Sequence, residues 1–167
     1  MANTTENLKA AFAGESQANR RYLFSAEEAD KAGQKQVARL FRAAAEAETV
    51  HARNHLGVLG EIKSTKDNLQ AAINGENYEF TKMYPEFIDR AKSDKNNAAL
   101  QSFDWANKVE KIHHGLFQKA LQGLEAGEKK ADKPFFVCQG CGYTVEGEAP
   151  EKCPVCGAPR SMFKRID

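Results

Sequence analysis

Two copies of one arrangement of acidic and imidazole side chains stand out in this sequence. Each copy joins a glutamate to a Glu-x-x-His pair that follows 33 or 34 residues later. The copies are Glu15 with Glu48 and His51, and Glu76 with Glu110 and His113. Residues three apart in a helix share one face, so each pair can reach the same metal ion. One such pair carries little information, but its repetition in register indicates the ligand set of helical proteins that bind two iron or manganese ions.

Metal ions would also explain why these charged side chains interrupt otherwise apolar helix faces. An unpaired charge in an apolar core costs several kcal/mol, so buried carboxylates need a cation. Ligation rich in oxygen, with only a few nitrogens, suits iron or manganese better than zinc or copper.

Four long helices are expected to position these ligands. Apolar side chains recur at three- and four-residue spacing over about 5–31, 34–59, 66–93 and 96–126. Gly33 supplies a stop for the first helix, and the polar segment 61–66 is a connection that can cap the third. Pro85 lacks a backbone N–H, so it predicts a kink or break near Tyr84.

A small second domain is expected at the end of the chain. All four cysteines form two Cys-x-x-Cys pairs there, namely Cys138, Cys141, Cys153 and Cys156. The pattern indicates a metal site flanked by short strands and leaves no thiol for disulfides, which fits a reducing compartment. Taken alone, paired knuckles more often hold structural zinc. The expected organisation is a helical bundle over 1–127, a linker over 128–134 and a metal-dependent domain over 135–167.

Charge and hydropathy exclude other classes of protein. The formal net charge is +1, with acids and bases interspersed, so no basic stripe is available for nucleic acid. The first thirty residues contain no signal-like apolar region, and no apolar run reaches eighteen residues. A cytoplasmic protein that does not enter the membrane is expected.

These motifs together resemble the rubrerythrin family over nearly the whole chain. The helical part of the resemblance rests on 14–18, 47–51, 75–79 and 110–113, and the tail part on the rubredoxin-like 138–143 and 153–157. Ferritins share the helical motifs but lack the tail. The resemblance implies a mainly α fold, a ferritin-like four-helix bundle followed by a small rubredoxin-like metal-knuckle β domain. It also implies iron bound to the four cysteines instead of zinc.

The same resemblance assigns the ligands of a di-iron centre. Glu15 would hold one iron and Glu76 the other, while Glu48 and Glu110 would bridge the two ions. His113 would stay on the second iron.

Four further roles follow from the resemblance. Glu79 would hold the first iron in the oxidised state, and His51 would replace it on reduction. Tyr22 and Tyr84 match tyrosines that form hydrogen bonds around the site, although buried tyrosines also serve simply to fill a core.

The implied activity is that of a non-haem di-iron peroxidase that reduces hydrogen peroxide to water in defence against oxidative stress. Electrons would enter through an Fe(Cys)4 centre from a rubredoxin or an NAD(P)H-dependent reductase. Three alternatives remain open: a ferroxidase or iron-storage protein, an oxygen-activating hydroxylase, and a structural helical protein with a zinc ribbon.

The short connection between the second and third helices bears on assembly. These helices run parallel in a ferritin-like bundle, so the connection must span about 30 Å. The eight steps from Gly60 to Asn68 reach at most about 26 to 29 Å. A homodimer that exchanges helix pairs would relieve the strain, and so would unwinding of the second helix back to Gly57.

Overall fold

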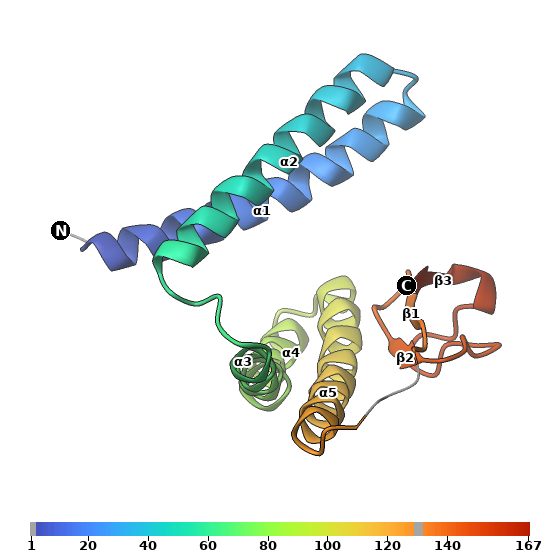
Figure 1. The fold of residues 1–167 in the computed structure, drawn as a ribbon. Helices are drawn as coiled ribbons and strands as arrows, with labels where there is room; N and C mark the ends of the chain where they lie inside the picture. Colours follow the sequence, from blue (N-terminus) through green and yellow to red (C-terminus); the bar gives the residue numbers. More distant parts are fainter. Residues whose placement is uncertain (1–2, 129–131) are drawn as a thin grey trace. The chain divides into compact units, whose positions relative to one another are not determined.

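The chain folds as two compact units, Met1–Lys63 and Ser64–Asp167 (Figure 1). The computed structural model describes residues 3–128 and 132–167. The first unit is a helical hairpin, and the second combines three α-helices with a small sheet. Within these described ranges, no helix is both long and apolar enough to cross a membrane.

Helices α1, Thr4–Lys31, and α2, Lys35–Val58, run antiparallel in the first unit (Figure 1). The side chain of Asn3 accepts a hydrogen bond from the backbone N–H of Glu6, and the Glu6 carboxylate accepts one from the backbone N–H of Asn3. This reciprocal cap satisfies donors that the first helical turn leaves free. Gly33 has φ 73°, a left-handed conformation that glycine adopts without strain, which confirms the predicted stop.

Helix α3, Thr65–Tyr78, continues into the π-helical segment η1, Glu79–Met83, and then into α4, Tyr84–Ser93. The sequence predicts one helix with a kink or break near Tyr84, and the structure shows how the interruption is made. The backbone N–H of Tyr84 donates to the carbonyl of Glu79, five residues back, so the helix widens by one residue. Pro85 cannot donate to the preceding turn, and a π-helical turn accommodates that loss. Ser64 caps α3 by accepting from the backbone N–H of Asp67, which confirms the predicted capping region.

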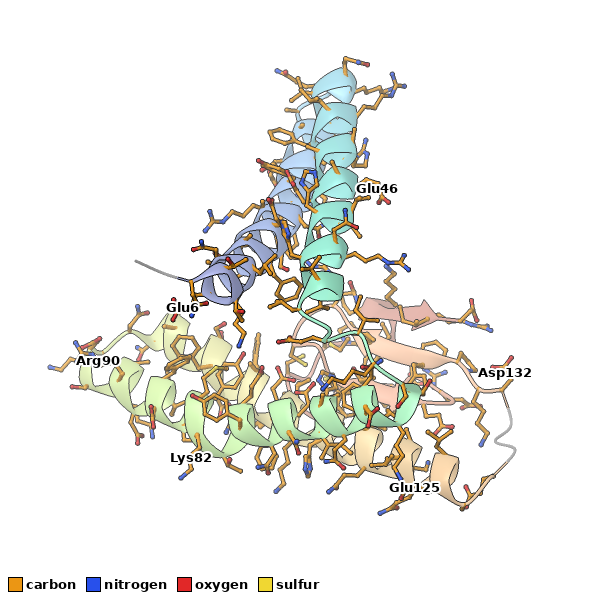
Figure 2. The ribbon with its side chains drawn as sticks, turned by 60° about the vertical axis from the view of Figure 1, so that its left-hand side comes forward. Glu6, Glu46, Lys82, Arg90, Glu125 and Asp132 are labelled. Carbon is orange, nitrogen blue, oxygen red and sulfur yellow. The ribbon has the colours of Figure 1, made fainter. Side chains whose placement is uncertain are left out.

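Helix α5, Asn97–Glu125, packs against α3 and α4 in the second unit. Its first turn is capped by Asn96, whose side chain accepts from the backbone N–H of Ala99. The buried apolar side chains of these helices are Ile73, Ala91 and Val109. Glu125, labelled at the end of α5 in Figure 2, pairs with Lys66 of α3 at 2.6 Å. The pair links the last turn of α5 to the first turn of α3.

A three-stranded antiparallel sheet of order β2-β1-β3 completes the second unit. Strand β1, Phe135–Cys138, pairs with β2, Thr144–Glu146, and with β3, Phe163–Ile166. The single turn η2, Arg160–Met162, leads into β3. Strands β1 and β2 were predicted around the first knuckle, whereas β3 was not predicted. The linker predicted over 128–134 includes 129–131, which lie outside the described residues.

Candidate metal centres

The first cluster consists of Glu15 from α1 with Glu48 and His51 from α2. One ligand atom from each residue lies within 4.8 Å of the other two. Nδ1 of His51 is 2.9 Å from Oε2 of Glu48 and 4.0 Å from Oε1 of Glu15. Ligand atoms held about 2.1 Å from one ion lie roughly 3 to 4 Å from each other, so these separations fit a metal ion.

Asn19 holds α1 and α2 together one turn after Glu15. Its side-chain amide donates to the backbone carbonyl of Ala45 at 2.7 Å and to the hydroxyl of Thr49 at 2.9 Å. These bonds maintain the facing positions of Glu15 and Glu48. This role of Asn19 was not predicted, because a single amide on a helix gives no signal of its long-range partner.

The second cluster repeats this geometry with Glu76 from α3 and with Glu110 and His113 from α5. The three ligand atoms again lie within 4.8 Å of one another. Nδ1 of His113 is 2.7 Å from Oε2 of Glu110 and 3.9 Å from Oε1 of Glu76. The six residues found by their spacing therefore form two triplets, one in each unit.

Electrostatics in the second cluster favour a bound cation. Burial raises the pKa of Glu76 to about 7, and the negative charge of Glu110 adds to the shift. The hydrogen bond to Glu110 raises the pKa of His113. The metal-free cluster therefore retains protons near neutral pH, and a divalent ion would replace their positive charge. The donor set fits a metal ion.

Glu79 opens the π-helical segment one turn after Glu76. It lies outside the triplet of the second cluster, but its charge contributes to the raised pKa of both Glu76 and His113. Burial raises the pKa of Glu79 itself, and Glu110 adds to that effect. Burial also raises the pKa of Tyr84, with contributions from Glu110, Glu79 and Glu76. The structure thus groups Glu79 and Tyr84 with the second cluster.

The remaining predicted residue, Tyr22, belongs to the first unit, where its half-buried ring lies 6.0 Å from that of Phe41. Its predicted hydrogen-bonding role stays a prediction. Glu46, two residues before Glu48, is exposed and projects from α2 away from α1 (Figure 2). The ligand face of α2 therefore carries Glu48 and His51 but excludes Glu46.

The four cysteines form a separate site in the sheet domain. All four Sγ atoms lie within 4.8 Å of one another. Sγ of Cys138 is 3.6 Å from that of Cys156, and Sγ of Cys141 is 3.5 Å from that of Cys153. These separations are too long for disulfides but close to the roughly 3.8 Å edge of a tetrahedron with metal–sulfur bonds of about 2.3 Å. The thiols fit one tetrahedral metal ion.

The two Cys-x-x-Cys knuckles share the same backbone turn. The N–H of Gly142 donates to the carbonyl of Cys138, and the N–H of Gly157 donates to that of Cys153. Both glycines have positive φ, 84° and 78°, which side chains disfavour. The first cysteine of each knuckle is buried and the second is half-buried. Cys141 and Cys156 are therefore the more accessible thiols.

One contact of the second cluster was not anticipated from the sequence. Nε2 of His113 lies 2.9 Å from the hydroxyl of Thr144, in strand β2 of the cysteine domain. Short strands were predicted around the cysteines, but a threonine in a strand gives no sign of a partner 31 residues away. A histidine of the second cluster thus contacts the cysteine domain within one unit.

This combination of helical carboxylate–histidine clusters with a rubredoxin-like knuckle defines a di-iron carboxylate protein with an Fe(Cys)4 domain. A family model described as Rubrerythrin matches residues 6–121, and one described as Rubrerythrin, rubredoxin-like domain, matches residues 136–164. The chain belongs to the rubrerythrin family. The resemblance inferred from the motifs is confirmed, together with the fold class and the cofactors that it implied.

Relatives align over almost the full chain. Rubrerythrin-2 of Clostridium acetobutylicum is 37% identical over 177 residues, covering 98% of this chain and 96% of that protein. Nigerythrin of Nitratidesulfovibrio vulgaris is 36% identical over 177 residues, covering 98% of this chain and 86% of the relative. A solved structure of nigerythrin in a mixed-valence state has a TM-score of 0.59 at 35% identity, covering 99% of this chain and 88% of that one. These relatives indicate an oxidoreductase.

Proposed function

We propose that this protein is a di-iron peroxidase that reduces hydrogen peroxide to two molecules of water in defence against oxidative stress. The reaction consumes two electrons and two protons for each peroxide. Iron at the carboxylate–histidine clusters would supply the electrons, and the four-thiol iron would return them one at a time. The observation that carries the proposal is the contact between His113 and Thr144, which places the second cluster against the cysteine domain within one unit.

That contact favours peroxide reduction over the alternatives. A ferroxidase or iron-storage protein would not need a one-electron centre beside its carboxylates. A structural zinc ribbon would not need two clusters of glutamate and histidine. A catalyst that must be re-reduced after every turnover needs both.

The chain's own carboxylates can manage the protons of this reaction. A general acid is most effective when its pKa lies near the working pH and it is within hydrogen-bond reach of the departing oxygen. Glu79, which leaves the metal in the proposed ligand exchange, and Tyr84 have raised pKa values in the metal-free cluster, for which burial is the first cause. We assign proton delivery to this group of side chains.

Two residues have the freedom needed for the ligand exchange that the family resemblance implies. The side chain of His51 is 53% exposed, compared with 27% for that of His113. Glu79 begins the π-helical segment, and such segments often occur at functional sites. We propose that Glu79 binds the first iron in the oxidised protein and that His51 replaces it in the reduced protein.

The electron donor in this proposal is a rubredoxin or an NAD(P)H-dependent reductase in the cytoplasm. Cys141 and Cys156 are both half-buried; Cys156 belongs to the second knuckle, and Cys141 belongs to the knuckle that continues into Thr144. Electrons would enter on the side of Cys156 and leave on the side of Cys141.

Steady turnover tests the proposal. The full-length protein, loaded with iron and supplied with NADH, a rubredoxin reductase and rubredoxin, should consume NADH when hydrogen peroxide is added. Replacing both Cys138 and Cys156 with serine should leave one oxidation of the ferrous clusters by peroxide intact but lower steady turnover by at least about 100-fold, because the one-electron centre is lost. Equal turnover by the variant would refute electron entry through the tail. Failure of the wild-type protein to turn over, with oxidation by dioxygen alone, would favour a ferroxidase.

Assembly is the second part of the proposal, since each unit supplies only three of the six clustered ligands. Apolar side chains also remain exposed on the first unit, namely Phe24, Val37, Leu40, Val50, Val58 and Ile62. We propose a homodimer in which the first cluster of one chain faces the second cluster of the other.

The connection between α2 and α3 supports exchange between chains. Helix α2 ends at Val58 and α3 begins at Thr65, seven steps that reach at most about 25 Å. In a parallel arrangement, the helix lengths beyond the metal level are about 12 Å in α2 and about 18 Å in α3, so a connection within one chain must span about 32 Å with the lateral offset. Backbone bonds from Gly60 to Gly57 and from Glu61 to Leu56 close α2, so unwinding it would break them.

A further inference from the structure

His113 is held from both sides of its imidazole ring. Nδ1 faces the second cluster, 2.7 Å from Oε2 of Glu110. Nε2 faces the opposite way, 2.9 Å from Oγ1 of Thr144. Oγ1 of Thr144 in turn lies 3.0 Å from the carbonyl oxygen of Gly142, to which it donates. The imidazole therefore bridges a ligand carboxylate on α5 and a hydroxyl on the sheet.

A metal ion on His113 would determine where the protons of this arrangement lie. A threonine hydroxyl carries one proton, and a backbone carbonyl can only accept. A metal ion bound to Nδ1 of His113 leaves the single hydrogen of the neutral imidazole on Nε2. Thr144 gives its own proton to Gly142, so its oxygen can accept that Nε2–H. The direction of Nδ1, toward Glu110 and Glu76, agrees with this assignment.

We propose that Thr144 is a positioning residue that holds the Nδ1 atom of His113 toward the metal of the second cluster. The inference rests on the proposed function and adds a residue of the cysteine domain to the support of the di-iron centre. Histidine ligands commonly donate their second ring N–H to an acceptor, which sets the tautomer and the orientation of the ring. Here the acceptor comes from another domain.

The anchor explains an asymmetry between the two clusters. His113 is half as exposed as His51, with side-chain exposures of 27% and 53%. A histidine tied to the sheet through Thr144 is suited to remain a ligand in both oxidation states. The more exposed His51 is suited to the exchange with Glu79.

Other contacts place Thr144 on α5 without involving its hydroxyl. Lys119 of α5 pairs with Glu146, two residues after Thr144 in β2, at 3.0 Å. A Cβ built on Gly142 would lie 3.7 Å from Cγ1 of Val109, so the knuckle also touches α5. The docking of the domain and the hydrogen bond to His113 can therefore be tested separately.

The test compares three variants of the full-length protein. Thr144→Val keeps the shape and strand preference of the side chain but removes the hydroxyl. Thr144→Ser retains the hydroxyl, and Glu146→Gln weakens docking while leaving Thr144 in place. The first readout is proton NMR of the fully reduced, iron-loaded protein, in which ferrous iron shifts the exchangeable ring N–H of a ligand histidine far downfield. The second readout is the affinity of the carboxylate–histidine centre for ferrous iron.

The N–H resonance of His113 should exchange slowly with solvent in the wild type, in Thr144→Ser and in Glu146→Gln. In Thr144→Val it should exchange at least about tenfold faster, and ferrous affinity should fall about tenfold. Unchanged exchange and affinity in Thr144→Val would overturn the proposal, as would equal losses in Thr144→Val and Glu146→Gln, which would assign the effect to docking. If Thr144→Val does not fold, the same losses in Thr144→Ala, with recovery in Thr144→Ser, support the proposal. None of these readouts uses peroxide, so they remain valid if the peroxidase proposal fails.

Discussion

Glu110 and His113 meet one helical turn apart on α5, with Oε2 of the glutamate 2.7 Å from Nδ1 of the histidine. Glu48 and His51 repeat this relationship on α2 at 2.9 Å. Each pair presents an oxygen and a nitrogen to the same point, because side chains at i and i+3 lie over one turn of helix. The duplication in the sequence is therefore a duplication of geometry, and each cluster can be perturbed by itself.

The first prediction concerns ligand exchange. His51→Ala should lower the ferrous affinity of the reduced protein by at least about tenfold and alter the oxidised site little, whereas Glu79→Ala should do the reverse. Structures and iron-binding measurements in both oxidation states check this. Glu46→Ala, on the outer side of α2, is the control and should change neither state. Iron held by His51 in the oxidised wild type, with Glu79 directed away, would contradict the exchange.

The second prediction concerns the stability of the metal-free protein against pH. Burial raises the pKa of Glu76 from its ordinary 4.5 to about 7. The folded state thus holds this proton more tightly than the unfolded state, and the stabilising contribution is fully present below pH 4.5 and lost as the pH rises through 7. Glu76→Gln should remove this loss, so the variant should gain stability relative to the wild type between pH 5 and pH 8.

Urea unfolding of the full-length protein across this pH range provides the measurement, with metal kept on the four cysteines and absent from the carboxylate–histidine clusters. Glu86→Gln, at an exposed position of α4, is the matched control and should follow the wild type. If the free energy of unfolding changes with pH in the same way in the wild type and in Glu76→Gln, Glu76 does not hold the proton. In the same range, ferrous affinity of the wild type should rise with pH, because metal must displace that proton.

The third prediction is that removing metal from the four cysteines unfolds the sheet but leaves the helices. Buried side chains in that domain are few, namely Cys138, Ala149 and Cys153 among the described residues. A core of this size does not stabilise about thirty residues, so metal binding must contribute most of the folding free energy. Dispersed amide resonances of β1, β2 and β3 should collapse on chelation, while the helical circular dichroism at 222 nm should remain. A sheet that persists without metal would contradict this reasoning.

The sequence predicted those features that depend on neighbours along the chain. The Glu-x-x-His pairs, the stop at Gly33 and the cysteine knuckles each express their geometry within a few residues, so spacing alone was sufficient. Spacing predicted that all six ligands face one centre, whereas the structure shows them as two triplets, one in each unit. The exact ligand roles stay predictions, since they depend on metal ions and oxidation state.

Features that depend on tertiary contacts could not be predicted in the same way. Pro85 predicted an interruption of the third helix. Whether the helix kinks or widens into a π-helical turn depends on how η1 packs against α5. Strand β3 carries Lys164 and Arg165 and exists because β1 offers it a free edge. The hydrogen bond between His113 and Thr144 joins residues that are 31 positions apart in the sequence, and a threonine in a strand gives no sign of such a partner.

The last prediction tests the exchange of helix pairs between chains. A Glu48→Ala chain has a damaged first cluster, and a Glu110→Ala chain has a damaged second cluster. If the two are unfolded and refolded together, half of the dimers contain one chain of each kind. In an exchanged heterodimer, one site combines both damaged clusters and the other combines both intact clusters, so about a quarter of wild-type sites should be recovered. Without exchange, every site carries one damaged cluster and activity is not restored.

A reciprocal mixture makes the result decisive. In this mixture, a chain with both substitutions is refolded with the wild-type chain. An exchanged heterodimer then has one damaged cluster in each of its sites and is inactive. Only the wild-type homodimers remain active, and they contain about a quarter of all sites. Without exchange, each wild-type chain keeps its own intact site and about half of the sites should be active. Exchange would be established if activity is recovered when the two single variants are mixed and about a quarter of the sites are active when the double variant is mixed with wild type. No rescue in the first and about half in the second would show that unwinding beyond Gly57 lets one chain complete its own site.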